Sequence, residues 1–174
     1  MTKGREEKMI LENIAKISLL DKSRRMGHDI CQFHQSQLSE PDYMSMVSKT
    51  VDKVMEELPK EKTTDILEIG AGSGIFSGRL IEKLAGSNGR FNLNITEPDP
   101  DLINFCREYI IAKKYNLSRD QKVQFLQLKA EDADRLKREY DAIVSTEVFH
   151  HIPYEDKLTS SKRLLHHLSK SGKM

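Results

Sequence analysis

Three glycines at alternate positions follow directly after the apolar run "DILEI": Gly70, Gly72 and Gly74. Glycine has no Cβ, so these positions tolerate positive φ angles and let a ligand lie directly against the backbone. The first amides of a helix beginning after the glycines would offer hydrogen-bond donors to an anionic group. A tight turn between a strand and a helix is the alternative, although one glycine would suffice for that. We therefore predict a ligand-binding turn.

The spacing of the glycines argues against two common nucleotide sites. A dinucleotide fingerprint needs G-x-G-x-x-G, and its last position falls on Ile75 when counted from Gly70 and on Ser77 when counted from Gly72. A P-loop needs G-x-x-x-x-G-K-[ST], which the chain lacks. We therefore expect neither NAD nor FAD at this turn, and no P-loop.

The carboxylate of Glu97 stands at the end of the next apolar segment, in "NITEPDP". An acidic residue about twenty positions after such a glycine turn can accept hydrogen bonds from both hydroxyls of a ribose. The alternative is a solvated charge before the turn at Pro98. The position at a strand end favours a nucleoside ligand with free hydroxyl groups.

The glycine turn requires a strand before it and a helix after it, and the apolar spacing predicts both. The full pattern predicts strands at residues 64–70, 90–98, 122–128 and 140–148, and helices at residues 75–86, 101–114 and 154–172, the last of them ending at Gly172. This alternation is typical of an α/β fold with right-handed crossovers and a parallel sheet.

Residues 1–62 differ in pattern and favour helices. Ile10, Ile14 and Ile17 recur at helical spacing, a second helix is expected at about residues 24–38, and an apolar stripe from Met44 to Leu58 ends at a proline. We expect an N-terminal helical lid over residues 1–62, beside the acceptor, and an α/β core over residues 63–174.

Four motifs together resemble a known family: "LEIGAGSG", "ITEPD", "KAEDAD" and "YDAIVSTEVFHHI" are similar in order and spacing to those of the class I S-adenosylmethionine-dependent methyltransferases. The resemblance covers roughly residues 64–152 and implies a Rossmann-like open parallel sheet with helices on both faces. Its strand order would be 3-2-1-4 for the four strands present. The implied cofactor is S-adenosyl-L-methionine.

The resemblance also implies a place for each part of that cofactor. Its residues would be Glu68, Gly70, Ala71, Gly72, Ser73 and Gly74 at the methionine part, Glu97 with Pro98 at the ribose, Ala130, Glu131 and Asp132 at the adenine, and Ser145 and Thr146 facing the sulfonium and the acceptor. Lys129 stands where many members have Asp, so the adenine contact would fall to Glu131 or Asp132. The Glu97–Pro98 pair and the polar pair after the fourth strand are similar to the histamine N-methyltransferase-like branch.

The catalytic candidates beside the transferable methyl group are Glu147, His150 and His151. Methyl transfer needs a general base only if the acceptor must lose a proton. The alternative role for the two histidines is to cap the turn before Pro153. No motif of the nucleic-acid amino-methylating enzymes and no Pro-Cys nucleophile is present. We therefore expect transfer to N or O of a small molecule, with a non-catalytic cofactor-binding subunit as the alternative.

Composition bounds the partners. Lys and Arg number 28 against 27 Asp and Glu, a formal charge of +1, so we expect no nucleic-acid partner. No apolar run reaches the length of about 18 residues that spans a bilayer, and the N-terminus does not resemble a secretion signal, so we expect a cytoplasmic protein. His28, Cys31 and His34 share one predicted helical face but lack a fourth ligand, so we expect no metal.

The end of the predicted fold raises one further expectation. The family fold continues with three more strands after the helix predicted to end at Gly172, whereas this sequence stops at Met174. The strand predicted at residues 140–148 would then be an exposed, apolar sheet edge, which tends to recruit another chain. We expect either a fragment of a longer protein or an edge that pairs with a partner or a second copy.

Overall fold

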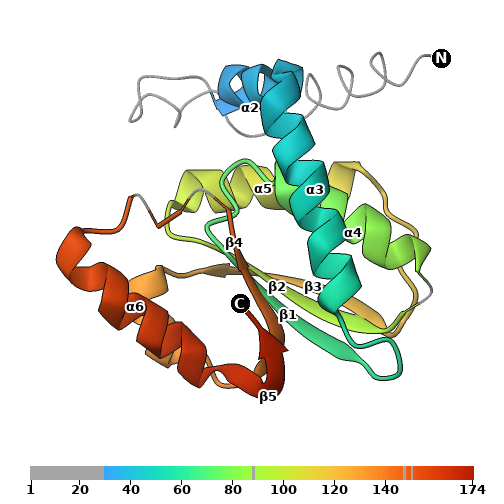
Figure 1. Cartoon of the computed structure of the whole chain (residues 1–174). Coiled ribbons are helices and arrows are strands. Elements are labelled where there is room, and N and C mark those ends of the chain that lie inside the picture. The colour runs from blue at the N-terminus through green and yellow to red at the C-terminus, as the bar shows by residue number, and fades with distance from the viewer. Residues whose placement is uncertain (1–29, 88, 147, 150) are drawn as a thin grey trace.

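The computed structural model describes residues 30–87, 89–146, 148–149 and 151–174 (Figure 1). Its elements are α2 (Ile30–Ser39), α3 (Pro41–Glu57), β1 (Thr64–Ile69), α4 (Ile75–Gly86), β2 (Phe91–Glu97), α5 (Pro100–Ala112), β3 (Gln121–Gln127), the 3-10 segment η2 (Ala130–Arg135), β4 (Tyr140–Ser145), α6 (Tyr154–His166) and β5 (Leu168–Lys173). The helix predicted around Ile10 to Ile17 lies outside the described residues.

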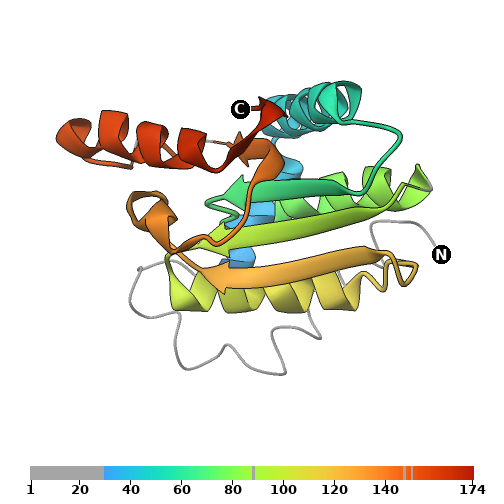
Figure 2. The ribbon, with the colours of Figure 1, turned by 90° about the horizontal axis from the view of Figure 1, so that it is seen from below.

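The five strands form one sheet in the order β3-β2-β1-β4-β5, and every pair is parallel. The strand order changes direction between β1 and β4, where a parallel sheet opens a crevice at its carboxyl ends. Figure 2 shows β1, β2 and β3 running side by side across the middle of the molecule. The predicted Rossmann-like open parallel sheet is confirmed.

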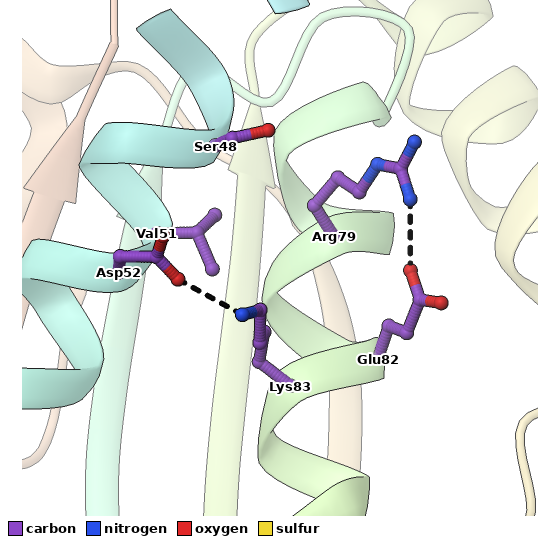
Figure 3. Close-up of a pocket in the computed structure, with 6 residues that line it drawn as sticks. All are labelled: Ser48, Val51, Asp52, Arg79, Glu82 and Lys83. Atoms are coloured by element: carbon purple, nitrogen blue, oxygen red, sulfur yellow. Dashed lines mark hydrogen bonds and ion pairs between the residues drawn. The ribbon is translucent and has the colours of Figure 1, made fainter. Parts of the chain in front are cut away.

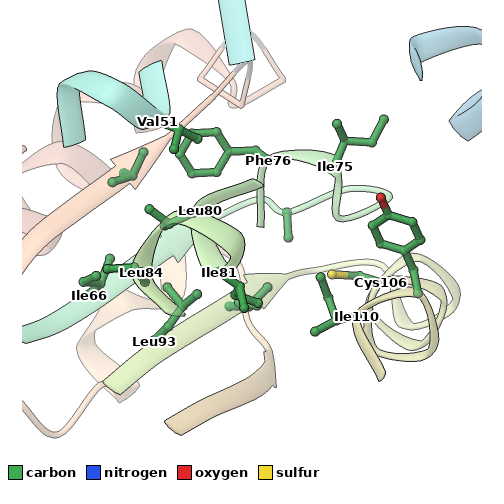
Figure 4. Close-up of a cluster of buried hydrophobic side chains, with 14 of the residues drawn as sticks. Val51, Ile66, Ile75, Phe76, Leu80, Ile81, Leu84, Leu93, Cys106 and Ile110 are labelled. Carbon is green, nitrogen blue, oxygen red and sulfur yellow. The ribbon is translucent and has the colours of Figure 1, made fainter. Parts of the chain in front are cut away.

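Helices cover both faces of the sheet, and each face has its own apolar cluster. On one face α3, α4 and α5 contribute Val51, Phe76, Leu80 and Ile110 to a cluster that includes Ile66 of β1 (Figure 4). On the other face, Leu67 and Ile69 pack with residues of η2 and α6. The alternation along β1 explains its nearly continuous apolar sequence, because a strand with both faces buried needs apolar residues throughout.

The N-terminal helices share the first of these clusters. Val47 and Val51 are buried against the core, and Leu58 follows α3 as its C-cap before the proline. The predicted stripe from Met44 to Leu58 is thus confirmed as a core-facing helix. The division into residues 1–62 and 63–174 stays a prediction.

Two predictions about the end of the sequence are wrong: the last helix does not reach Gly172, and the strand predicted at residues 140–148 is not a sheet edge. Residues 168–173 do not continue the last helix but form β5, which pairs with β4, with Tyr140 opposite Leu168 and Ala142 opposite Lys173. The helix ends at His166, and the His167 carbonyl accepts a hydrogen bond of 2.7 Å from the Tyr140 amide. The unpaired backbone of β4 decides this structure, although "LSKSGK" lacks strand alternation. Consequently β4 is an inner strand, and the described residues place β5 at the sheet edge opposite β3.

Among the described residues, none of the helices is both long enough and apolar enough to cross a membrane.

Candidate functional site

The glycine turn adopts the backbone that its sequence predicts. Gly70, Gly72 and Gly74 have φ angles of 72°, 54° and 86°, and residues other than glycine rarely adopt such positive values. A Cβ on Gly70 would lie 2.2 Å from Cγ2 of Val148, and one on Gly74 would lie 2.7 Å from Sγ of Cys106. A Cβ on Gly72 would meet no atom within 4 Å. The outer glycines therefore allow close packing, whereas Gly72 borders open space.

Glu97 is held against this turn. Its Oε2 accepts a hydrogen bond of 2.9 Å from the Gly72 amide, and its Oε1 accepts one of 3.2 Å from the Asp99 amide. The two segments meet because β1 and β2 are parallel neighbours, with Ile69 opposite Thr96. Burial raises the pKa of Glu97, while both amides act to lower it. The structure thus brings the two strongest sequence signals into direct contact.

A cleft of about 650 Å³ opens at this contact. The lining includes eight residues predicted from the sequence: Gly70, Ala71, Gly72, Ser73, Glu97, Pro98, Thr146 and His151. The other lining residues are Ile30, Phe33, Gln37, Tyr43, Phe76, Asp99, Leu102 and Val148. The carboxyl ends of β1, β2 and β4 therefore supply the polar side, and α2 and α3 supply much of the apolar side.

Six predicted residues lie outside the lining: Glu68, Gly74, Ala130, Glu131, Asp132 and Ser145. Glu68 is fully buried behind the turn, and neither of its carboxyl oxygens has a hydrogen-bond partner among the described residues. Its burial raises the pKa of Glu68 to about 7. Burying a carboxyl group without a hydrogen-bond partner costs folding free energy, above all in the charged form. The charge state of Glu68 therefore affects the electrostatics of the turn.

The predicted adenine segment is η2, which starts beside Glu97. The Leu128 amide donates a 3.3 Å hydrogen bond to the Glu97 carbonyl, and Nε2 of Gln127 donates one of 3.1 Å to the Pro98 carbonyl. Within η2, Ala130 is buried and Asp132 is exposed. The end of β3 thus places this segment next to the predicted ribose residue.

Of the catalytic candidates, His151 lines the cleft, and its charge acts to lower the pKa of Glu97. The His151 amide donates a 2.9 Å hydrogen bond to the Val148 carbonyl in the turn after β4. Glu147 and His150 lie outside the described residues. Their assignments stay predictions.

Helix α2 forms one wall of the cleft, although no motif in the sequence of α2 predicts this. Phe33 and Gln37 line the cleft, and the Ser73 hydroxyl donates a 3.1 Å hydrogen bond to Oε1 of Gln37. The wall is therefore tied to the glycine turn. Only the helical spacing of the N-terminal region indicated that a helix would lie here.

His34, next to Phe33 in α2, anchors this helix to the core. It is fully buried, with its ring 4.5 Å from that of Tyr109 and 5.3 Å from that of Phe105 between centroids. Burial lowers the pKa of His34 to about 4. His28 lies outside the described residues. Within the described part of the chain, no three His, Cys, Asp or Glu side chains are placed so that they could bind a metal ion.

A smaller groove of about 400 Å³ lies between α3 and α4 (Figure 3). Its charged groups pair with one another: Nζ of Lys83 lies 3.0 Å from a carboxylate oxygen of Asp52, and Nη1 of Arg79 lies 3.1 Å from one of Glu82. The Lys83–Asp52 pair joins the two helices at the surface, whereas the Arg79–Glu82 pair lies within α4. We assign no ligand to this groove.

Several solved structures have a similar fold. One is a putative S-adenosyl-L-methionine-dependent methyltransferase from Methanococcus maripaludis, with TM-score 0.59, 13% identity, and 80% of this chain and 58% of that chain covered. Another is magnesium protoporphyrin IX methyltransferase from Synechocystis PCC 6803 with bound SAM, with TM-score 0.55, 13% identity, and 94% and 72% covered. A third is the cyclopropane synthase MmaA2 from Mycobacterium tuberculosis, with TM-score 0.52, 16% identity, and 70% and 38% covered.

At these identities the likeness shows the fold alone. The chain spans 38 to 50% of the length of the cyclopropane synthases that it matches. A search of curated proteins found no match. A family model described as "Methyltransferase domain" matches residues 67–174, which is more than half of the chain. Together with the parallel sheet and the glycine turn at the switch point, this match shows that the chain belongs to the methyltransferase domain family.

Proposed function

We propose that the cleft binds S-adenosyl-L-methionine and that the protein transfers its methyl group to N or O of a small molecule. The observation that carries the proposal is the contact between the Gly72 amide and Glu97 at the carboxyl ends of β1 and β2, next to the switch point of a parallel sheet. Family membership supports the reaction class. The open space beside Gly72 supports the presence of a ligand against the backbone.

The residues around the turn fit the parts of this cofactor. Among the described residues, each carboxylate oxygen of Glu97 accepts one hydrogen bond. A carboxylate has about four acceptor sites, so Glu97 can still accept from ribose hydroxyls. Gly70, Ala71 and Gly72 would hold the methionine part, with Glu68 behind it adding negative charge once it ionises near pH 7. Ala130, Glu131 and Asp132 would approach the adenine, and Thr146 and Ser145 the sulfonium.

The chemistry requires little of the protein. The cofactor, when bound, supplies an activated methyl group, so the protein mainly aligns the acceptor and excludes water. Phe33, Tyr43 and Phe76 provide an apolar wall that can exclude water. Where the methyl acceptor must lose a proton, His151 would act as the general base. Glu147 and His150, four residues and one residue before it in the sequence, are the other candidates.

The binding half of the proposal is tested by parallel titration calorimetry with S-adenosylmethionine, S-adenosylhomocysteine and NAD. We expect dissociation constants on the order of micromolar for the first two, within the usual range for enzyme ligands, and no binding of NAD. Equal or tighter binding of NAD would overturn the cofactor assignment.

The catalytic half is tested with methyl-labelled S-adenosylmethionine and pools of small amines, phenols and a whole cell extract. Histamine belongs in the amine pool, because the Glu97–Pro98 resemblance to the histamine N-methyltransferase-like branch stays a prediction. Label transfer that falls in a His151→Ala variant, with cofactor affinity unchanged, supports catalysis by this chain. Tight cofactor binding without transfer to any acceptor supports the non-catalytic alternative.

A further inference from the structure

Arg163 of α6 contacts η2 at two points. Its Nε lies 3.1 Å from a carboxylate oxygen of Asp134, and its Nη1 donates a hydrogen bond to the Glu131 carbonyl. A planar guanidinium makes both contacts in one fixed geometry, which the ammonium group of a lysine cannot do. Arg163 thus holds two different parts of η2 at once.

The segment η2 has few other polar anchors among the described residues. The side chain of its N-cap residue, Lys129, makes no capping hydrogen bond, and the helical backbone is broken at Asp132, where φ is −98° and ψ is 20°. Its apolar anchors are Ala130 and Ala133, which pack in one cluster with Leu164 of α6. Alanine buries little surface, so these contacts hold η2 against α6 but do not determine the orientation of its polar side chains and carbonyl groups.

Two structural links connect Arg163 with the cleft. The start of η2 follows Leu128, whose amide is bonded to the Glu97 carbonyl. Helix α6 follows the turn that carries Thr146 and His151, both of which line the cleft. Arg163 therefore joins the segment after β3 to the helix after β4, on either side of the switch point.

Resting on the proposed function, we infer that Arg163 is a positioning residue for recognition of the cofactor's base. It holds η2 so that Glu131 and Asp132 present acceptors to the exocyclic amine of adenine. Hypoxanthine carries a carbonyl group at that position, which these acceptors would repel. The arginine thereby sets the selectivity for adenine without touching the ligand.

The first test measures whether Arg163 holds η2, and it needs no ligand. In Arg163→Met, backbone amides of residues 130–135 should exchange hydrogen about fivefold faster, the scale on which such network substitutions act. Arg163→Lys should give an intermediate rate, because a lysine keeps only the ion pair. The matched control is Lys162→Met, which removes a charge from the adjacent exposed position. Unchanged exchange in Arg163→Met would overturn the inference.

The second test measures selectivity by titrating S-adenosylhomocysteine and S-inosylhomocysteine. The wild-type protein and Lys162→Met should prefer the adenine ligand, and Arg163→Met should lose about fivefold of that preference. A merely structural defect would weaken both ligands alike and leave the ratio unchanged, which would overturn the positioning role. If the wild-type protein binds neither ligand, the proposed function fails together with the selectivity role, while the exchange rates still decide whether Arg163 holds η2.

Discussion

Two buried carboxyl groups at the glycine turn differ in their surroundings. The exposed fraction is 1% for Glu68 and 7% for Glu97. Two backbone amides bond the carboxylate of Glu97, which favours its charged form. Glu68 has no such bond among the described residues, so burial dominates and raises its pKa to about 7. The ionisation of Glu68 near neutral pH should therefore influence both stability and binding.

The first residue-scale prediction follows from this pKa. A glutamate in the unfolded chain loses its proton near pH 4.5, whereas Glu68 keeps it until about pH 7. Between these values the folded protein binds more protons, so Glu68 makes the free energy of unfolding fall as the pH rises. The Glu68→Gln variant has no such group to ionise. Between pH 5 and pH 8 its free energy of unfolding should rise relative to that of the wild type by up to about 3 kcal/mol.

Urea unfolding of both proteins at several pH values measures that difference. His34, whose pKa is lowered to about 4, acts in the opposite direction, since its buried neutral form costs stability at acid pH. Its contribution is present in both proteins and cancels in the difference. A difference that stays flat with pH would show that Glu68 ionises normally in the folded state.

The second residue-scale prediction concerns Gly72. The Gly72→Ala variant places a Cβ in the space beside the turn and forces alanine to a φ of 54°, which costs about 1–2 kcal/mol. The protein should fold while binding of S-adenosylhomocysteine is lost. Gly86→Ala is the matched control, because its Cβ meets no atom within 4 Å and its φ is not positive. Normal binding by Gly72→Ala would show that the ligand does not lie on this backbone.

The third residue-scale prediction concerns the proposed ribose contact. Glu97→Ala should weaken cofactor binding by about 1.5–3 kcal/mol, the scale for a hydrogen bond to a charged group. Calorimetry measures this directly, with Glu61→Ala as a control that removes an exposed charge. Unaltered affinity in Glu97→Ala would place the ribose elsewhere.

At the scale of elements, β5 shows how pairing overrides a local pattern. Gly172 lies in β5, where a Cβ would approach the Tyr140 carbonyl oxygen at 2.9 Å and Cγ of Leu168 at 2.8 Å. Gly172→Ala should therefore destabilise the protein by about 1–3 kcal/mol, the usual cost of overpacking. If the last helix continued to residue 172, the same change would instead stabilise it.

Thermal or urea unfolding gives the sign of this effect. Ser171→Ala is the control, because residue 171 is exposed in the same strand and a surface change should stay within about 0.5 kcal/mol. Stabilisation by Gly172→Ala would refute the strand.

At the scale of the whole molecule, self-association depends on which strand lies at the edge of the sheet next to β4. The expectation of self-association through β4 assumed that β4 was an unpaired edge strand, but β5 pairs with it. The new edge, β5, is six residues long and carries Lys170 and Lys173, and short, lysine-bearing edges resist pairing with other chains. We therefore predict that the chain of 20.0 kDa sediments as a monomer. A concentration-dependent dimer in sedimentation velocity would contradict this.

The sequence by itself determined the ligand turn, the acidic strand end and the alternation of strands and helices. These signals are local: the glycines specify their own backbone, and apolar spacing specifies an element within a few residues. Gly72 and Glu97 could be paired in advance, because the carboxyl ends of neighbouring parallel strands must meet at one edge of the sheet.

Only the tertiary structure decided the rest. Residues 168–173 form a strand because β4 offers them unpaired backbone groups, and Phe33 and Gln37 reach the cleft because burial of the neighbouring His34 holds α2 against the core. Arg163 meets η2 because α6 folds back onto the segment after β3. Each of these contacts joins segments far apart in the chain, and a long-range contact leaves no periodic trace in either segment.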